Sequence, residues 1–164
     1  MFKTHNTIVA TLSLKNILMG APLKTKEVHH KQRVHQGIKE INYSFFLMAQ
    51  RLKPSLSIID AFQRMEGDGP ADGEAVEAKV AVAGTDFLAV DRVGVEVMGI
   101  DFSTIGYLNY CAAANLGVGD LDRIKILGAS IDNCRRPFQL HQNVAHQYQW
   151  RENVAHQYQW RENV

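Results

Sequence analysis

The strongest constraint on the fold is a ten-residue segment near the middle of the chain, residues 65–74, with the sequence MEGDGPADGE. Three glycines, one proline and two aspartates within ten residues exclude a helix or a central strand, so a loop is predicted here. Short apolar runs typical of strands lie on either side, SLSIID at residues 55–60 and KVAVA at residues 79–83. The loop therefore separates two predicted strands.

The remaining pattern alternates strands with helices. Further strands are predicted where β-branched and aliphatic residues cluster, at residues 7–14 and 123–127. Helices are predicted where apolar residues recur at helical spacing before a glycine or proline, at residues 15–19, 32–52, 86–98 and 103–116. We expect Asp86 and Ser103 to cap the last two. This order favours an α/β fold with a mixed or partly parallel sheet flanked by helices.

Composition excludes several classes of function. The chain has 164 residues, which fits one domain, and its 18 basic and 17 acidic residues give no electrostatic reason to bind nucleic acid or an acidic membrane. No apolar run is long enough for a transmembrane helix. The two cysteines, Cys111 and Cys134, lack a CxxC spacing, so we expect no iron–sulfur cluster ligated by this chain. Two lone thiols fit a reducing compartment, and the expected location is cytoplasmic.

The C-terminus carries a perfect repeat. The ten residues NVAHQYQWRE at 143–152 recur at 153–162. A single duplication cannot build a solenoid, which needs at least three units. We therefore expect a single α/β domain over residues 1–142, followed by a duplicated extension over residues 143–164. Each copy holds one tryptophan, and one copy is expected to pack on the domain.

Candidate acidic residues follow the predicted strands. Asp60 ends one strand, Glu66 and Gly69 lie in the glycine-rich loop, and Asp86 follows the next strand. Ligands of α/β sheets bind at the carboxyl ends of strands, so these positions predict a site. Asp91 lies inside the apolar arc of helix 86–98. There it either braces a loop by accepting backbone N–H bonds, or acts as a metal ligand or an acid–base group.

Candidate cationic residues flank the first predicted strand. Lys3 and His5 precede it, and Lys15 and Asn16 follow it. Such groups can hold a phosphate or carboxylate, although a solvated turn has the same composition. His29, His30 and His35 lack the i, i+4 spacing of a zinc site on a helix.

Four segments carry a family resemblance: KTHNTIVATLSLKNILMG at residues 3–20, SIIDAFQRMEGDGPADG at 57–73, AGTDFLAVDRVGVEVMG at 83–99 and GVGDLDRIKILG at 117–128. In this order they resemble the domain of unknown function 362, an uncharacterised family often found in iron–sulfur proteins. The resemblance implies a further segment ahead of the KTH motif, so the chain is expected to represent the C-terminal part of the domain and to lack an N-terminal portion. It carries over no catalytic role. By motif match it points to Lys3, His5, Lys15, Asn16, Asp60, Glu66, Gly69, Pro70, Asp86 and Asp91.

Three hypotheses follow for function. The first is a redox-linked enzyme domain that binds a small anionic ligand or a divalent metal. Its catalytic candidates are Lys3, His5 and Asp91, and its ligand-binding candidates are Lys15, Asn16, Asp60, Glu66, Gly69 and Asp86. The second is a non-catalytic interaction module for an iron–sulfur partner or for the missing N-terminal part, which predicts an exposed apolar patch. The third is a truncated, non-functional remnant, which should not unfold cooperatively.

Overall fold

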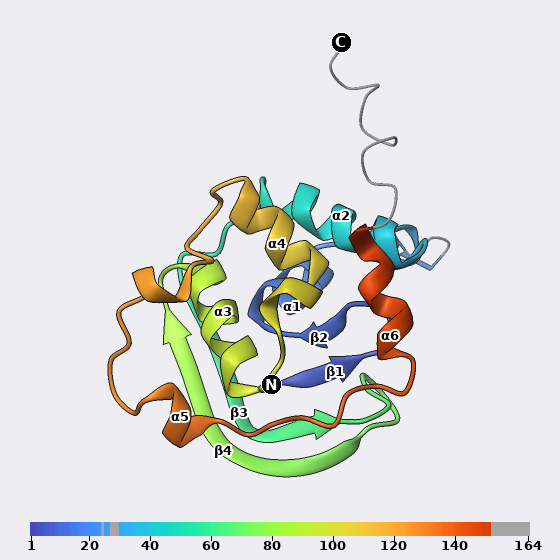
Figure 1. Cartoon of the computed structure of the whole chain (residues 1–164). Coiled ribbons are helices and arrows are strands. Elements are labelled where there is room, and N and C mark those ends of the chain that lie inside the picture. Colours follow the sequence, from blue (N-terminus) through green and yellow to red (C-terminus); the bar gives the residue numbers. More distant parts are fainter. Residues whose placement is uncertain (24, 27–29, 152–164) are drawn as a thin grey trace.

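A mixed four-stranded sheet organises the chain in the computed structural model, which describes residues 1–23, 25–26 and 30–151 (Figure 1). Its strands are β1 (Lys3–His5), β2 (Val9–Thr11), β3 (Ser57–Glu66) and β4 (Glu74–Gly84), in the order β2-β1-β3-β4. β1 pairs parallel with β3, whereas β1–β2 and β3–β4 are antiparallel. The predicted α/β fold with a mixed, partly parallel sheet is confirmed.

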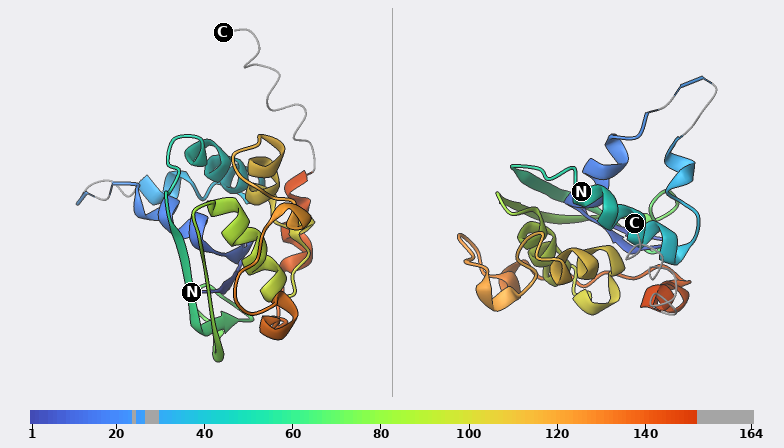
Figure 2. Two further views of the ribbon diagram at one scale, coloured as in Figure 1. Left: turned by 90° about the vertical axis from the view of Figure 1, so that its left-hand side faces the viewer. Right: turned by 90° about the horizontal axis from the view of Figure 1, so that it is seen from above.

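Helices flank this sheet. The longer ones are α1 (Ser13–Gly20), α2 (Ile38–Ala49), α3 (Phe87–Val97) and α4 (Gly106–Ala113), and α5 (Ile131–Cys134) and α6 (Val144–Gln147) are single turns. Short 3₁₀ turns cover His30–Arg33, Phe102–Thr104, Leu121–Arg123 and Tyr148–Arg151. Figure 2 shows α3, α4 and α6 on one side of the sheet and α1 on the other. None of the helices in the described ranges is long and apolar enough to cross a membrane.

Helix α3 packs closely against the sheet through Gly94. A Cβ at this position would lie 3.0–3.2 Å from Phe2, Leu12 and Ile59, so only glycine allows this approach without repacking. The predicted start of the helix is confirmed, because Asp86 Oδ1 accepts hydrogen bonds from the Leu88 and Ala89 amides at 2.9 Å. Through the contacts of Gly94, residues next to β1 and β2 and a residue of β3 pack against α3 in one core.

Several predicted elements end elsewhere. The strand predicted at residues 7–14 is only β2, because α1 already begins at Ser13. The helix predicted at residues 32–52 begins only at Ile38, after Gly37 with a φ of 146°. That backbone conformation is open to glycine and interrupts a helix. The helix predicted at 103–116 is α4, which is shorter, and Asp101 rather than Ser103 caps the 3₁₀ turn before it.

The glycine-rich loop connects a β-hairpin. β3 continues to Glu66 and β4 begins at Glu74, so the ends of the predicted loop belong to the strands. Of residues 79–83, predicted to be a buried strand, only Val80 is buried and Val82 is half-buried, because one face of β4 is open to solvent. The strand predicted at residues 123–127 is absent, since this segment follows a 3₁₀ turn and pairs with no described strand.

The first copy of the C-terminal repeat packs on the domain. The buried side chain of Gln147 accepts a hydrogen bond from the Val9 amide, and Trp150 is 6% exposed. The Trp150 ring meets the ring of Tyr110 edge-on, with centroids 5.3 Å apart. The second copy, residues 153–162, lies outside the described residues.

Candidate functional site

The structure brings the cationic residues at the start of the chain together. Lys3 and His5 are alternate residues of β1 and so project from the same face of the strand. Lys15 lies in the first turn of α1, where its charge acts on His5 and the charge of Lys3 acts on it. Lys31, in the 3₁₀ turn His30–Arg33, and His35, just after it, complete the group. We call Lys3, His5, Lys15, Lys31 and His35 the N-terminal cation cluster, after its three lysines.

His5 is the buried centre of this cluster, with 2% of its surface exposed. Its Nδ1 accepts a hydrogen bond from the Thr7 amide at 3.1 Å, so the neutral ring carries its proton on Nε2. Burial lowers the pKa of His5 to about 3, and the neighbouring charges of Lys15, His35 and His141 act in the same direction. The ring stacks on the exposed His35, with centroids 6.4 Å apart.

Lys15 is partly buried beside other cations. Burial lowers its pKa to about 8, and repulsion from Lys3 and Lys31 acts in the same direction. Among the described residues neither Lys3 nor Lys15 forms an ion pair with a carboxylate. Asn16 is exposed next to them and borders a cavity of about 300 Å³ between α1 and the start of β3.

The glycine-rich loop lies against β1 next to His5. Thr4 Oγ1 donates to the Gly67 carbonyl at 2.8 Å. A Cβ on Gly69 would lie 2.5 Å from the Thr4 carbonyl oxygen, so this position requires glycine. Glu66, at the start of the loop, pairs with Arg64 at 3.0 Å rather than with a residue of the cation cluster. Gly69 therefore sets the close approach of the loop, and no lysine engages Glu66 among the described residues.

The three candidate aspartates do not share a site. Asp60 is exposed in the middle of β3, opposite Ala81, and accepts a hydrogen bond from the Phe62 amide at 2.9 Å. Asp86 accepts three backbone N–H bonds at the start of α3, the third from Val118 at 2.9 Å. The structure therefore does not gather these carboxylates opposite the cations. β3 continues beyond Asp60 to Glu66, so Asp60 does not end a strand, and its side chain projects from the exposed face of β3, whereas Asp86 caps α3 and Asp91 lies within this helix, which packs on the buried face.

Asp91 serves as an internal brace. It is fully buried in α3, and its two oxygens accept hydrogen bonds from the Ser13 and Leu14 amides at 2.9 and 3.0 Å. These amides are at the N-terminus of α1, where carboxylates satisfy donors that the helix leaves free. Burial nevertheless raises the pKa of Asp91 to about 7 against the effect of both hydrogen bonds. Of the two roles expected from the sequence, this geometry corresponds to the bracing one.

Within residues 1–23, 25–26 and 30–151, no group of three or more His, Cys, Asp or Glu side chains could hold a metal ion. Lys31 and His141 were not predicted as site residues. They come from a turn and from the C-terminal segment, and only the tertiary fold brings Lys31 near Lys15 and His141 near His5.

A family model matches the first part of the chain. The family model described as a domain of unknown function (DUF362) matches residues 1–96, which include the cation cluster, the glycine-rich loop and Asp91. The match starts at the first residue, so it does not support the expectation that only the C-terminal part of the domain is represented.

One curated protein with which the chain shares similarity is the thylakoid-associated protein sll1697 of Synechocystis sp., at 28% identity over 103 residues. The aligned part covers 63% of this chain and 32% of that protein, so the chain spans about a third of the length of this relative. No solved structure matches.

Proposed function

The chain belongs to the family described as a domain of unknown function (DUF362), and we propose that it binds a small anionic ligand at the N-terminal cation cluster. The observation that carries the proposal is the pair Lys3 and Lys15. Both are partly buried, each lies within the field of the other, and neither is neutralised by a carboxylate among the described residues.

An anion bound between Lys3 and Lys15 would reduce the repulsion between their charges. Cations that are partly removed from water and placed side by side raise the free energy of the folded protein, which is why the pKa of Lys15 falls to about 8. A phosphate or carboxylate group between them would attract both ammonium groups and accept hydrogen bonds from them. The Nε2–H of His5 supplies a further donor, because its Nδ1 is already bound to the Thr7 amide.

The proposal includes an enzymatic role linked to redox chemistry. Its support is the resemblance to a family often found in iron–sulfur proteins, together with an amine whose pKa of about 8 lets it exchange a proton near neutral pH. In this role Lys15 would donate a proton to, or accept one from, the bound anion, while Lys3 and His5 would orient it. The electrons would come from a partner.

The test uses inorganic phosphate and acetate as probes, with the melting temperature of the full chain as readout. Phosphate should raise the melting temperature near pH 7 and should lose this effect as the pH rises through 8, where Lys15 loses its charge. Lys15→Gln should abolish the effect. The matched control is Lys53→Gln, which removes one exposed lysine after α2. Equal stabilisation of both variants by phosphate would contradict the proposal.

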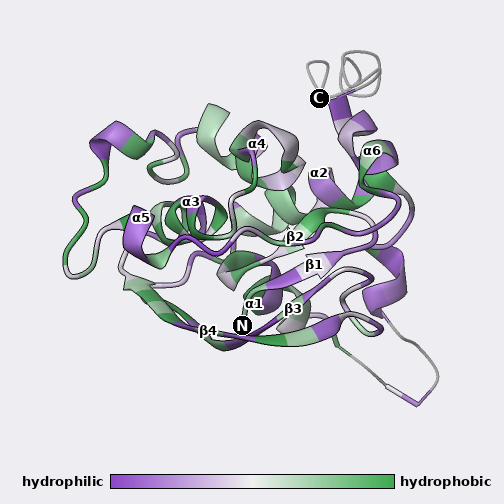
Figure 3. Cartoon of the chain, turned by 60° about the horizontal axis from the view of Figure 1, so that its bottom comes forward, coloured by the Kyte–Doolittle hydropathy of each residue, from purple (hydrophilic) through white to green (hydrophobic). Residues whose placement is uncertain are grey.

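A second candidate function is supported by a separate feature. The outward face of β3 exposes three large apolar side chains, Leu56 just before it, Ile58 and Phe62, at 57, 62 and 56%. Apolar and polar stretches both occur along the ribbons of β3 and β4 (Figure 3). Exposed apolar side chains grouped in this way are typical of protein interfaces. We propose that this β3 face docks an iron–sulfur partner protein or a further part of a longer family member, as the interaction-module hypothesis expects.

This second proposal has its own assay. A ferredoxin immobilised on a resin should retain the wild-type chain, and the double substitution Ile58→Glu and Phe62→Glu should remove that retention. Leu23→Glu places a charge at an apolar side chain that is 66% exposed outside the β3 face and is the control. Retention of all three proteins to the same extent would reject docking through β3.

A further inference from the structure

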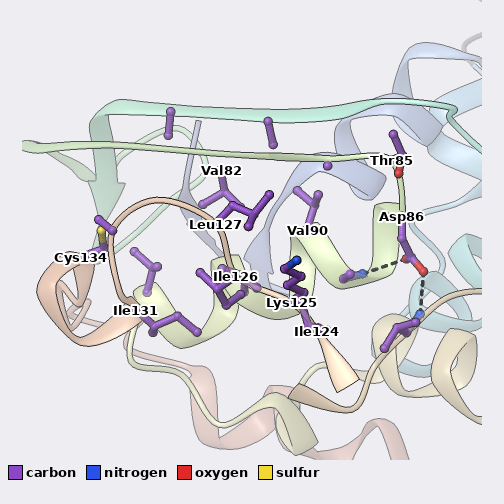
Figure 4. A pocket seen from close by; sticks show the side chains of 18 of the residues that line it. Val82, Thr85, Asp86, Val90, Ile124, Lys125, Ile126, Leu127, Ile131 and Cys134 are labelled. Carbon is purple, nitrogen blue, oxygen red and sulfur yellow. Dashed lines mark hydrogen bonds between the residues drawn. The ribbon is translucent and has the colours of Figure 1, made fainter. Parts of the chain in front are cut away.

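The outer edge of β4 faces a large cavity. β4 stands at one end of the strand order and pairs only with β3 in the described sheet. A cavity of about 520 Å³ lies between this edge, helix α3 and the segment from Val118 to Cys134 (Figure 4). None of the residues of the N-terminal cation cluster borders it, so it is independent of the proposed anion site.

The walls of the cavity are mostly apolar. Five consecutive β4 residues, Val80 to Gly84, form one wall, so the main chain of the strand itself borders the space. Ala89, Val93 and Val97 follow one another at i, i+4 spacing along α3 and form the floor. Ile124, Ile126 and Leu127 also line the cavity, and the close-up draws Ile126 and Leu127 in the space between β4 and α3 (Figure 4).

This combination of walls suits an extended polypeptide better than a compact ligand. An unpaired strand edge presents main-chain N–H and C=O groups that another strand can pair with. Five residues of such a strand would extend about 17 Å along the edge. Every second side chain would point toward α3 and be buried against its valines, and the others would face solvent. The added segment therefore needs alternating apolar and polar residues.

The charges that line the cavity indicate that the polar residues of the added segment are acidic. Arg123 and Lys125 line the cavity from the segment that crosses it, and neither pairs with a carboxylate among the described residues. The carboxylate at this cavity belongs to Asp86, whose oxygens already bind the Leu88, Ala89 and Val118 amides. Acidic side chains on the incoming strand would complement the two cations.

We propose that the free edge of β4 binds an extended segment of a partner protein in which apolar and acidic residues alternate, and that this segment adds to the sheet as a strand beside β4. The competing occupant is the chain's own segment at residues 123–127, whose sequence RIKIL also alternates and already lies across the cavity. The experiment distinguishes the two.

The probe is a fluorescein-labelled nine-residue peptide of alternating valine and glutamate, added to the full chain at low salt and followed by fluorescence anisotropy. We expect saturable binding, and roughly ten-fold weaker binding when lysine replaces glutamate. Two further peptides carry N-methyl groups on all valines or on all glutamates. Because only one set of N–H groups faces β4, one of these peptides should lose binding and the other should keep it.

Two variants locate the site. Ala89→Phe fills the cavity from the α3 side and should weaken binding about ten-fold. Ala113→Phe, at an exposed position of α4, should leave binding unchanged. Equal binding of both N-methylated peptides, or no binding of the parent peptide, would overturn the proposal. Protection of all amides of residues 80–84 from hydrogen exchange in the free protein would overturn it too, because the chain's own segment would then occupy the edge.

Discussion

Replacing Asp91 with asparagine should change how the stability of the protein depends on pH. The carboxyl group is fully buried, and its two oxygens hold the Ser13 and Leu14 amides at the start of α1. Asparagine keeps the shape of the side chain but cannot ionise, and its NH₂ group would face one of the two amide donors. The variant is therefore expected to be less stable than the wild type at acidic pH.

The magnitude follows from the raised pKa. The pKa of Asp91 is about 7 in the folded protein, against 3.8 for an aspartate in water. Between these pH values the folded state keeps a proton that the unfolded state releases, so raising the pH favours unfolding. A difference of about three units corresponds to about 4 kcal/mol. The stability advantage of wild type over Asp91→Asn should thus be fully present below about pH 4 and smaller by about 4 kcal/mol above about pH 7.

The assay is urea-induced unfolding followed by far-ultraviolet circular dichroism, at several pH values between the two pKa values of Asp91 and slightly beyond them. Asp132→Asn, at an exposed carboxylate of α5, makes the same substitution at the surface and is the control. A single cooperative transition would also argue against a non-functional remnant. If the wild-type advantage stayed constant, burial would not govern Asp91. If it grew with pH, the two amide hydrogen bonds would outweigh burial, which would refute the reasoning.

Three further predictions use the same unfolding measurements or simple thiol chemistry. His5→Gln should make the stability of the protein less sensitive to acid, by about 3 kcal/mol between about pH 6.5 and 4. The reason is that the lowered pKa of His5 makes the wild type lose stability as the pH falls through this window. Parallel pH profiles of the two proteins would count against this prediction. Gly69→Ala should destabilise the chain by about 2 kcal/mol, because the added Cβ would contact the carbonyl oxygen of Thr4 in β1. Gly20→Ala, whose Cβ meets no atom within 4 Å, should stabilise α1 by about 0.5 kcal/mol. Equal melting temperatures of the two variants would contradict this. An aromatic disulfide reagent should label the partly exposed Cys134 in the folded protein. It should label Cys111 only after unfolding, because this thiol is buried and has a pKa of about 12. Rapid reaction of both thiols in the folded protein would show that the core is open.

The opposing effects of His5 and Asp91 explain why variants are needed for these tests. As the pH falls from about 6.5 toward 4, the wild type loses stability through His5 and gains it through Asp91. The two contributions have similar size and opposite sign, so the wild-type profile alone should be shallow. Each substitution removes one contribution and leaves the other visible.

Local sequence signals predicted the features that depend on neighbours along the chain. The glycine-rich segment indicated the loop, and the periodicity of residues 86–98 indicated α3 with its Asp86 cap and with Asp91 inside its apolar arc. The alternation of strands and helices indicated the α/β class. In each case the energy that decides the structure is available within a few residues.

What depends on distant partners could not be predicted in this way. The length of the strand was undetermined, so Asp60 was expected at a carboxyl end beside Asp86, but β3 runs on to Glu66 and Asp60 projects from its exposed face. Residues 123–127 have a strand-like sequence but form no strand, because main-chain pairing needs a partner that lies at the correct distance. The sequence alone determined which segments can be helical, extended or looped. The tertiary structure decided which charges meet, because burial and pairing energies arise only when segments far apart in sequence are brought into contact.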